Sequence, residues 1–379
     1  MKSKNPMNIL PQFRNLFQEL EKGYLERRET LNRRPEKGKE LEAILTLELS
    51  KMESWRRPIM EQLWAIHRGL SHEERIKHEE FVRQSTFRRV LYEEAPFYRR
   101  IIDKPEGYAG DAESMRIIYR NAFEGHTPFG MFAHKQATEC MTGQALRNRR
   151  AFLRSHIHQV REKGGGRILS IAAGPAMEIQ DVLAGDHSSN TLHFHAFDHD
   201  IKTIRSVCRE CADPRLFYVL GNAFHLMKGN YHVAIPRKPF LKYCNPRRDF
   251  KGIRKALLPL KYSTMKLKSK DYNLIYSAGL YDYIKTFQDD PTKGTIALTK
   301  HVFELLQPAG ALVVGNFSSD TPTDIRFMLD YVCEWKLIYR TKEEMFDFAR
   351  GIPPHQIKNM EVLQEPLGIN YFLKIEKRQ

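Results

Sequence analysis

The stretch from Arg167 to Ile179, with the sequence RILSIAAGPAMEI, constrains the fold of this chain more than any other. Ile168 to Ile171 form a short apolar run of the kind found in a strand covered on both faces. The next residues, Ala-Ala-Gly-Pro, carry no bulky side chain, so a ligand could approach main-chain N–H groups there. The stretch therefore predicts a strand, a tight turn and the start of a helix. An ordinary βα turn without a ligand explains it equally well at this point.

The N-terminal part of the chain predicts helices. Between residues 11 and 100, apolar residues recur at spacings of three and four, as in Phe13, Phe17 and Leu20, and charged residues occupy the other positions. Ser71-His72-Glu73-Glu74 has the pattern of a capping box at a helix start. We predict an N-terminal helical domain with lid loops over residues 1–150. Its loops, 95–111 and 124–130, are rich in Pro, Gly and aromatic residues, and fit either a lid or plain connectors.

From Arg167 onward, strand and helix patterns alternate, which favours a doubly wound α/β sheet in a second domain, residues 151–379. The strands predicted here are 168–171, 192–197, 216–220, 272–276 and 311–317, followed by a hairpin of about 360–364 and 371–376. In such a sheet, ligands bind beyond the carboxyl ends of the strands, near the point where the strand order reverses.

Three of these strand ends carry small or polar residues. The first is followed by Gly174, the second closes on Asp198, and the third is followed by Asn222 and Ala223. An acid at the second position is placed to accept hydrogen bonds from the hydroxyls of a ribose. The three-glycine fingerprint of a dinucleotide site is missing, because only Gly174 is present. The pattern therefore predicts a nucleoside ligand without a diphosphate.

The segment 228–270 is strongly basic, with thirteen lysines and arginines against one acid, Asp249, in a chain of net charge +15. Charge concentrated in this way attracts an anionic partner, such as a nucleic acid or an acidic carrier protein. We predict the segment as a basic insertion, and a solvated surface loop without a partner is the alternative.

The sequence has no apolar run long enough to span a membrane and no signal-peptide core, so we expect a cytoplasmic protein. Five cysteines fit reduced thiols, and we predict no metal site.

Taken together, these motifs resemble class I S-adenosylmethionine-dependent methyltransferases, whose Rossmann-like seven-stranded sheet ends in a hairpin. PEGYAGD (105–111), ILSIAAGP (168–175), YSAGLYDY (276–283), GNF (315–317) and WKLIYRT (335–341) are more specifically similar to a bacterial family associated with methyl esters of 3-hydroxy fatty acids, used as quorum-sensing signals. The resemblance implies S-adenosylmethionine as the cofactor and methylation of a small molecule or lipid, and the acceptor it implies is the carboxylate of a 3-hydroxy fatty acid.

Residue by residue, the resemblance implies two sets of functional side chains. The methionine part of the cofactor would contact Ala173, Gly174, Pro175 and Glu178, and its ribose would contact Asp198. The adenine would lie beside Asn222 and Ala223. Ser277 would belong to the wall between cofactor and acceptor. The residues expected to orient the acceptor or act on it are Tyr108, Tyr281, Asp282, Asn316 and Arg340. Tyr281 could instead be a core aromatic, and Glu178 an ordinary first-turn acid.

The acceptor stays open between several classes. A carboxylate acceptor is already ionised and needs only orientation, whereas a hydroxyl or amine acceptor needs a base such as Asp282. Methylation of another metabolite, or of RNA through the basic segment 228–270, is an alternative with the same fold. A module that senses the cofactor without catalysis is an alternative of another class.

Overall fold

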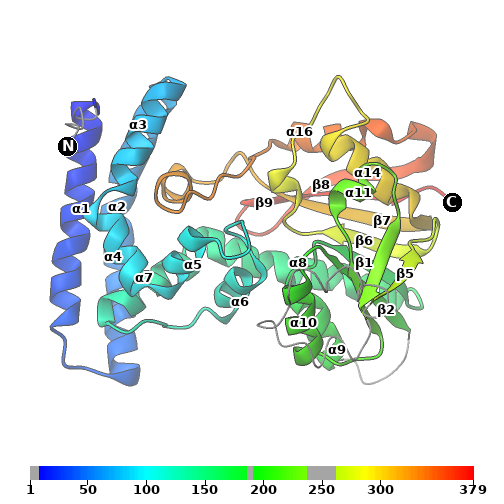
Figure 1. Cartoon of the computed structure of the whole chain (residues 1–379), viewed down its shortest axis with the longest axis horizontal. Helices are drawn as coiled ribbons and strands as arrows, with labels where there is room; N and C mark the ends of the chain where they lie inside the picture. The colour runs from blue at the N-terminus through cyan, green and yellow to red at the C-terminus, as the bar shows by residue number, and fades with distance from the viewer. Residues whose placement is uncertain (1–7, 186–190, 237–261) are drawn as a thin grey trace, which may run out of the picture. The chain divides into compact units, whose positions relative to one another are not determined.

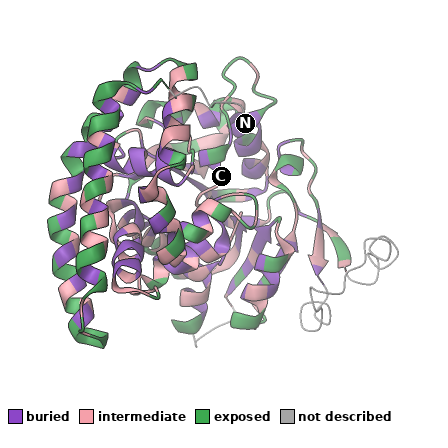
Figure 2. Cartoon of the chain, turned by 60° about the vertical axis from the view of Figure 1, so that its left-hand side comes forward, coloured by how far each residue is buried: buried purple, intermediate pink, exposed green. Residues whose placement is uncertain are grey.

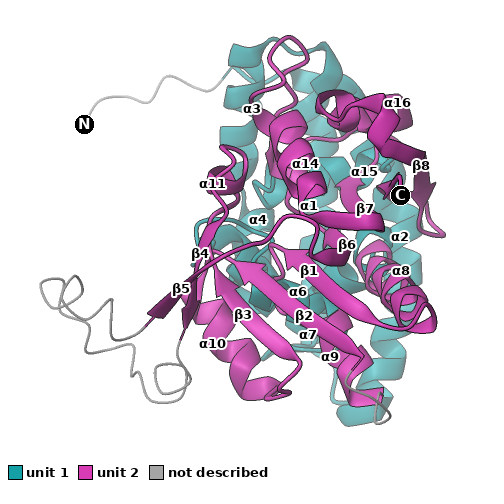
Figure 3. Cartoon of the chain, turned by 90° about the vertical axis from the view of Figure 1, so that its right-hand side faces the viewer, with its two compact units in different colours: residues 1–144, 321–336 teal, residues 145–320, 337–379 magenta. Residues whose placement is uncertain are grey.

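The computed structural model describes residues 8–185, 191–236 and 262–379, and the chain divides into two compact units (Figures 1 and 3). Unit 1 comprises residues 1–144 and 321–336, and unit 2 comprises residues 145–320 and 337–379. The chain therefore passes from unit 2 into unit 1 and back again between residues 320 and 337.

Unit 1 is helical, as predicted for the N-terminal part of the chain. Its helices are α1 (Pro11–Asn32), α2 (Gly38–Gly69), α3 (His72–Arg83), α4 (Thr86–Glu94), α5 (Pro96–Asp103), α6 (Ala112–Arg120), α7 (Pro128–Glu139) and α15 (Thr323–Phe327), which continues into a π-helical turn, Met328–Val332. The capping box at the start of α3 is confirmed, since the Ser71 hydroxyl accepts from the Glu74 N–H and the Glu74 carboxylate accepts from the Ser71 N–H.

The segment 321–336 completes the core of unit 1. The sequence alone does not reveal that this segment packs with the N-terminal helices. The His67 ring hydrogen-bonds the hydroxyl of Tyr331 at 2.8 Å, and Phe327 stacks on Tyr331 beside Phe13. The Glu334 carboxylate accepts hydrogen bonds from the side chains of Arg83 and Arg88. Packing and ion pairs thus bind this segment to helices more than 200 residues earlier in the chain.

Unit 2 is built on one large sheet. Among the described residues it has nine strands in the order β5-β4-β3-β2-β1-β6-β7-β9-β8. The strands are β1 (Gly166–Ile171), β2 (Leu192–Asp198), β3 (Leu216–Leu220), β4 (His232–Pro236), β5 (Tyr262–Lys266), β6 (Tyr272–Ser277), β7 (Leu306–Phe317), β8 (Ile357–Gln364) and β9 (Asn370–Lys377). The five strands β3, β2, β1, β6 and β7 are parallel, while β9 pairs with β7 and β8 with β9 in antiparallel fashion.

The prediction of an α/β sheet is confirmed, and all seven predicted strands are present. The predicted number of strands was too low by two. The additional strands, β4 and β5, pair antiparallel with each other and extend the sheet beyond β3. Both belong to the basic segment 228–270, which was predicted as an insertion; its middle part, residues 237–261, lies outside the described residues.

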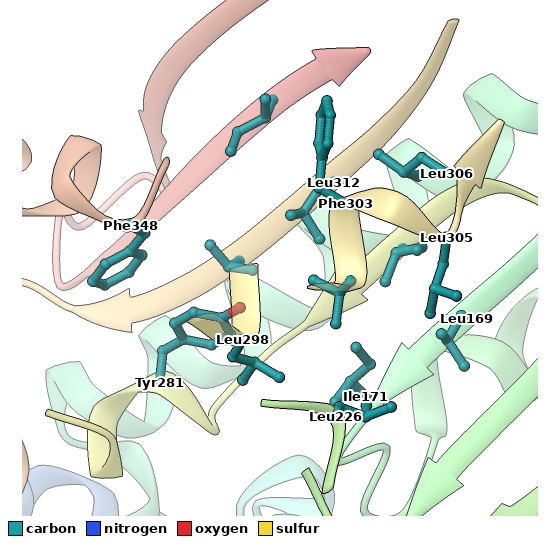
Figure 4. Close-up of a cluster of buried hydrophobic side chains, with 14 of the residues drawn as sticks. Leu169, Ile171, Leu226, Tyr281, Leu298, Phe303, Leu305, Leu306, Leu312 and Phe348 are labelled. Carbon is teal, nitrogen blue, oxygen red and sulfur yellow. The ribbon is translucent and has the colours of Figure 1, made fainter. Parts of the chain in front are cut away.

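Helices cover both faces of the sheet. On one face, α8 (Met141–Glu162), α9 (Met177–Gly185) and α10 (Ile201–Glu210) pack on apolar side chains such as Ile168 and Phe194. On the other face, α11 (Ala223–Leu226), α14 (Gly294–Glu304) and the 3-10 turn Asp347–Gly351 pack on side chains such as Leu169 and Ile171 (Figure 4). In Figure 2, buried residues make up much of the strands of the sheet. Successive residues of β1 therefore enter different cores, which explains its continuous apolar run. The short helix α16 (Lys342–Phe346) precedes that 3-10 turn.

Within residues 8–185, 191–236 and 262–379, no helix is long and apolar enough to cross a membrane. The same residues contain no group of three or more His, Cys, Asp or Glu side chains arranged to hold a metal ion.

Candidate functional site

The strand order of unit 2 reverses between β1 and β6. From β1 the chain proceeds outward through β2 to β3, and it then returns to place β6 on the other side of β1. Neighbouring loops leave in opposite directions at such a point and open a crevice at the carboxyl ends of the strands. The residues that follow β1, β2, β3 and β6 therefore form the candidate site.

The turn after β1 holds its backbone in an unusual conformation. Ala172, Gly174 and Ala176 all have positive φ angles, of 53°, 53° and 49°. A left-handed conformation costs an alanine roughly 1–2 kcal/mol, and such strain tends to concentrate at functional sites. A Cβ atom added to Gly174 would meet nothing within 4 Å. The turn thus borders open space, where a ligand can contact its main chain.

Asp198, at the end of β2, closes this turn from the neighbouring strand. Its Oδ2 accepts the main-chain N–H of Gly174 at 2.9 Å, and its Oδ1 accepts that of Asp200 at 2.9 Å. Burial raises the pKa of the Asp198 carboxyl, and these two hydrogen bonds act in the opposite direction. Each carboxylate oxygen can accept a further hydrogen bond, so the group can still receive two hydroxyls from a ligand.

Glu178 lies in the first turn of α9 and is only 6% exposed. Its Oε1 accepts a hydrogen bond from the hydroxyl of Tyr276, on β6, at 2.8 Å. Burial raises the pKa of Glu178, while the Tyr276 hydrogen bond and the charge of Arg149 lower it. A buried carboxylate at the junction of β1 and β6 is suited to bind an ammonium group.

Ser277 and Asn222 are both engaged in local hydrogen bonds. The Ser277 hydroxyl donates to the carbonyl of Ile171 at 3.1 Å and links the ends of β6 and β1. The Oδ1 of Asn222 accepts the N–H of Phe224 at 2.8 Å and caps α11, whose first residue is Ala223. The Phe224 side chain is 62% exposed. An aromatic base can stack on a flat apolar ring and hydrogen-bond an amide side chain, so Phe224 and Asn222 suit such a ligand.

Tyr281 and Asp282 form part of a 3-10 turn, Tyr281–Tyr283, just beyond β6. The Tyr281 ring lies in the apolar core beside Phe348 and Leu298 (Figure 4), and its hydroxyl hydrogen-bonds Thr299 at 3.1 Å. The Asp282 carboxylate accepts the main-chain N–H of Phe317, at the end of β7, at 2.6 Å. Burial raises the pKa of Asp282 to about 6.

Asn316 and Arg340 form a buried clamp behind this turn. The guanidinium of Arg340 donates to the carbonyls of Tyr281 and Ile284 and to Oδ1 of Asn316. The amide of Asn316 donates to the carbonyls of Phe317 and Ile338, both at 2.8 Å. These contacts hold the loop after β6 against the end of β7, so both side chains act on the main chain.

A cavity of about 550 Å³ lies beside this clamp in unit 2. It is lined by Phe287, Ile338 and Tyr339, by the cations Lys285 and Arg340, and by four acids, Asp289, Asp290, Glu344 and Asp347.

Tyr108 lies in unit 1 and is half-buried on the loop before α6. On the same loop, Asp111 caps α6 and binds Arg100 through both carboxylate oxygens.

Arg149, on α8, belongs to the site but was not among the predicted residues. Its side chain is only 5% exposed, and its Nη1 donates to the carbonyl of Ala278, just after β6, at 2.9 Å. The same helix also carries Arg147, Arg150 and Arg154, so the sequence alone predicts one more charged residue on the surface. Its burial beside the end of a strand is visible only in the fold.

No family model and no curated protein matches this chain. Among solved structures, it is similar to a protein from Bordetella parapertussis described as a possible exported protein, with 14% identity, a TM-score of 0.48, and coverage of 88% of this chain and 97% of that one. A Burkholderia thailandensis 1,6-didemethyltoxoflavin-N1-methyltransferase with bound S-adenosylhomocysteine matches with 12% identity, a TM-score of 0.35, and coverage of 62% and 79%. The methyltransferase domain of a citrinin polyketide synthase matches with 12% identity, a TM-score of 0.42, and coverage of 97% and 89%. Similarity at this level assigns no activity to the chain.

Proposed function

We propose that this chain is an S-adenosylmethionine-dependent methyltransferase that acts on a small molecule. The observation that carries the proposal is the hydrogen bond between Gly174 and Asp198, which joins the strained turn after β1 to an acid at the end of β2. This arrangement lies at the reversal of a sheet in which the seven neighbouring strands β3-β2-β1-β6-β7-β9-β8 end in the β8–β9 hairpin, and the resemblance implies seven strands and such a hairpin. The missing diphosphate fingerprint fits a cofactor with a ribose and no pyrophosphate.

The described residues offer a partner to each part of this cofactor. Asp198 would accept hydrogen bonds from the ribose hydroxyls, and Asn222 and Ala223, with Phe224 beside them, would border the adenine. The turn Ala173-Gly174-Pro175 would lie along the methionine part, with Glu178 accepting from its ammonium group. Ser277 would form the wall of the site between β1 and β6.

When bound, S-adenosylmethionine supplies an electrophilic methyl group on a sulfonium sulfur. The protein's task in such an in-line displacement is to place the acceptor behind that methyl group and to exclude water. We propose that Tyr281, Asn316 and Arg340 do this indirectly, by fixing the loop after β6. Asp282, in the same unit as the strand ends, is the side chain we propose to act on the acceptor itself.

The carboxylate of a 3-hydroxy fatty acid, giving a methyl ester, is the acceptor we propose first. Its support is the sequence resemblance in the segments 105–111, 276–283 and 335–341. The cavity beside Arg340 adds apolar side chains and the cation Lys285, which together suit an amphipathic acid.

An amine acceptor is a second candidate, favoured by the charge of the same cavity. Four acidic side chains line it against two cations, which favours a cationic ligand. Such an acceptor must lose a proton before transfer, and a carboxyl whose pKa is raised to about 6 by burial, as in Asp282, is suited to accept it near neutral pH.

The test is to incubate the purified chain with methyl-labelled S-adenosylmethionine and a lipid and metabolite extract, and to identify labelled products by mass spectrometry. A labelled ester of a hydroxy fatty acid would support the first acceptor, and a labelled amine the second. Cofactor binding without any S-adenosylhomocysteine formed would contradict catalysis and leave a cofactor-sensing module.

A further inference from the structure

Arg149 is directed toward the candidate site by the way α8 is fixed on unit 2. The next residue, Arg150, binds Asp181 on α9 through its Nε, at 2.7 Å, and its Nη2. Three residues after Arg149, the Phe152 ring stacks on Phe372 of β9 with centroids 4.1 Å apart. Neighbouring residues of a helix project about 100° apart, so a helix that points Arg150 at α9 points Arg149 elsewhere. In this fold it points to the end of β6.

The main chain after β6 is shaped to receive this guanidinium. Its Nη1 donates to the carbonyl of Ala278 at 2.9 Å. The next residue is Gly279, and a Cβ atom added there would lie 3.0 Å from the same Nη1. A side chain at 279 would require the guanidinium to shift by a few tenths of an ångström. Glycine at this position leaves the guanidinium room for its close approach to the main chain.

Arg149 lies among buried carboxylates of opposite charge. Burial raises the pKa values of Glu178 and Asp282, and the positive charge of Arg149 lowers both. Glu178 is on α9, beside β1, whereas Arg149 contacts the chain after β6. The site therefore presents an anionic group on one side of the reversal point and a cationic group on the other.

A zwitterionic amino acid has the complementary pair of charges. An ammonium group suits Glu178, and a carboxylate suits the planar fork of a guanidinium, which can donate two parallel hydrogen bonds. We propose that Arg149 binds the carboxylate of the methionine part of S-adenosylmethionine, so that the protein distinguishes the intact amino acid from its decarboxylated form. This inference rests on the proposed function and adds to it a specificity for the amino-acid end of the cofactor.

The experiment measures dissociation constants by calorimetry for S-adenosylmethionine, its decarboxylated form and methylthioadenosine. For the unaltered protein we expect decarboxylation to weaken binding about 10- to 100-fold, the usual effect of a charged hydrogen bond. In Arg149→Met, affinity for S-adenosylmethionine should fall by the same factor and affinity for the decarboxylated form should not change. Arg154→Met is the matched control on the same helix, and it should keep the full discrimination.

Two further variants keep the inference testable if Arg149→Met does not fold. Gly279→Ala moves the guanidinium without removing it, and we expect a several-fold loss of affinity for S-adenosylmethionine only. Glu178→Gln keeps an acceptor for the Tyr276 hydroxyl and removes the charge. It should weaken both amine-containing ligands and leave methylthioadenosine unaffected.

The outcomes separate this inference from the proposed function. If the unaltered protein binds none of the three ligands, the proposed function fails. If it binds S-adenosylmethionine but Arg149→Met and Gly279→Ala keep the preference for the carboxylate, only the role of Arg149 is overturned. Equal losses for all three ligands in Arg149→Met would also overturn it, since a merely structural residue gives that result.

Discussion

The main-chain N–H of Gly174 donates to Oδ2 of Asp198 at 2.9 Å, so the turn after β1 is held by the acid that closes β2. The N–H of Ala173 also donates to the carbonyl of Phe197 at 3.0 Å. These bonds keep Ala172 and Gly174 in left-handed conformations at the candidate site. The strain of the turn is thus supported by the neighbouring strand.

This strain predicts opposite effects at two adjacent alanines. Ala172→Gly should raise the free energy of unfolding by up to about 1 kcal/mol, because glycine adopts a positive φ without a steric penalty. Ala173→Gly relieves no such strain, because Ala173 does not have a positive φ, and it should lower the free energy of unfolding by about 0.5–1 kcal/mol. Urea unfolding of both variants tests this, and equal destabilisation would contradict the strained turn.

The buried carboxyl of Asp282 predicts a pH dependence of stability. Because its pKa is raised from 3.8 to about 6 in the folded state, the folded chain holds a proton that the unfolded chain releases between these values. Asp282 therefore makes stability fall as pH rises from about 4 to about 6, with no further change above that. Asp282→Asn should remove this contribution and keep an acceptor for the Phe317 N–H.

The measurement is the difference in unfolding free energy between Asp282→Asn and the unaltered protein at several pH values. We expect the variant to gain stability relative to the unaltered protein from pH 4 to pH 6. A difference that stays constant over this range would show that the carboxyl titrates normally.

The clamp of Arg340 predicts a large stability effect at a residue first considered catalytic. Arg340→Met removes the donors to the carbonyls of Tyr281 and Ile284 and leaves them buried without these partners. We expect a loss of about 3 kcal/mol in unfolding free energy. Arg350→Met is the control, since the Arg350 side chain is exposed and its ion pair with Asp347 should contribute less than about 1 kcal/mol. Equal effects of the two substitutions would contradict the clamp.

The parallel strands of unit 2 could be predicted because burial on both faces leaves a continuous apolar run, as in Ile168 to Ile171. Strands β4 and β5 were not predicted, because they lie in a strongly basic segment and β5 has no buried residue. The segment 321–336 has the apolar pattern of any core element, so its sequence does not reveal which unit it completes.

That the ends of β1, β2 and β3 lie side by side could be predicted from the sequence, whereas the direction in which a single side chain points could not. A tyrosine in the motif 276–283 can face a ligand or the core, and only the fold shows Tyr281 beside Phe348. In the same way, nothing in the sequence separates the buried Arg149 from the half-buried Arg154 of the same helix.

The central claim is that S-adenosylmethionine binds at the carboxyl ends of β1 and β2 with Asp198 holding its ribose. A calorimetric titration tests it most directly on the unaltered protein, Asp198→Asn and the control Asp213→Asn, whose acid pairs with Arg215 just before β3. We predict saturable binding to the unaltered protein and the control, and affinity at least about 10-fold weaker for Asp198→Asn, which loses the charged acceptor. Absence of binding to the unaltered protein, or equal affinity for all three, would contradict the claim.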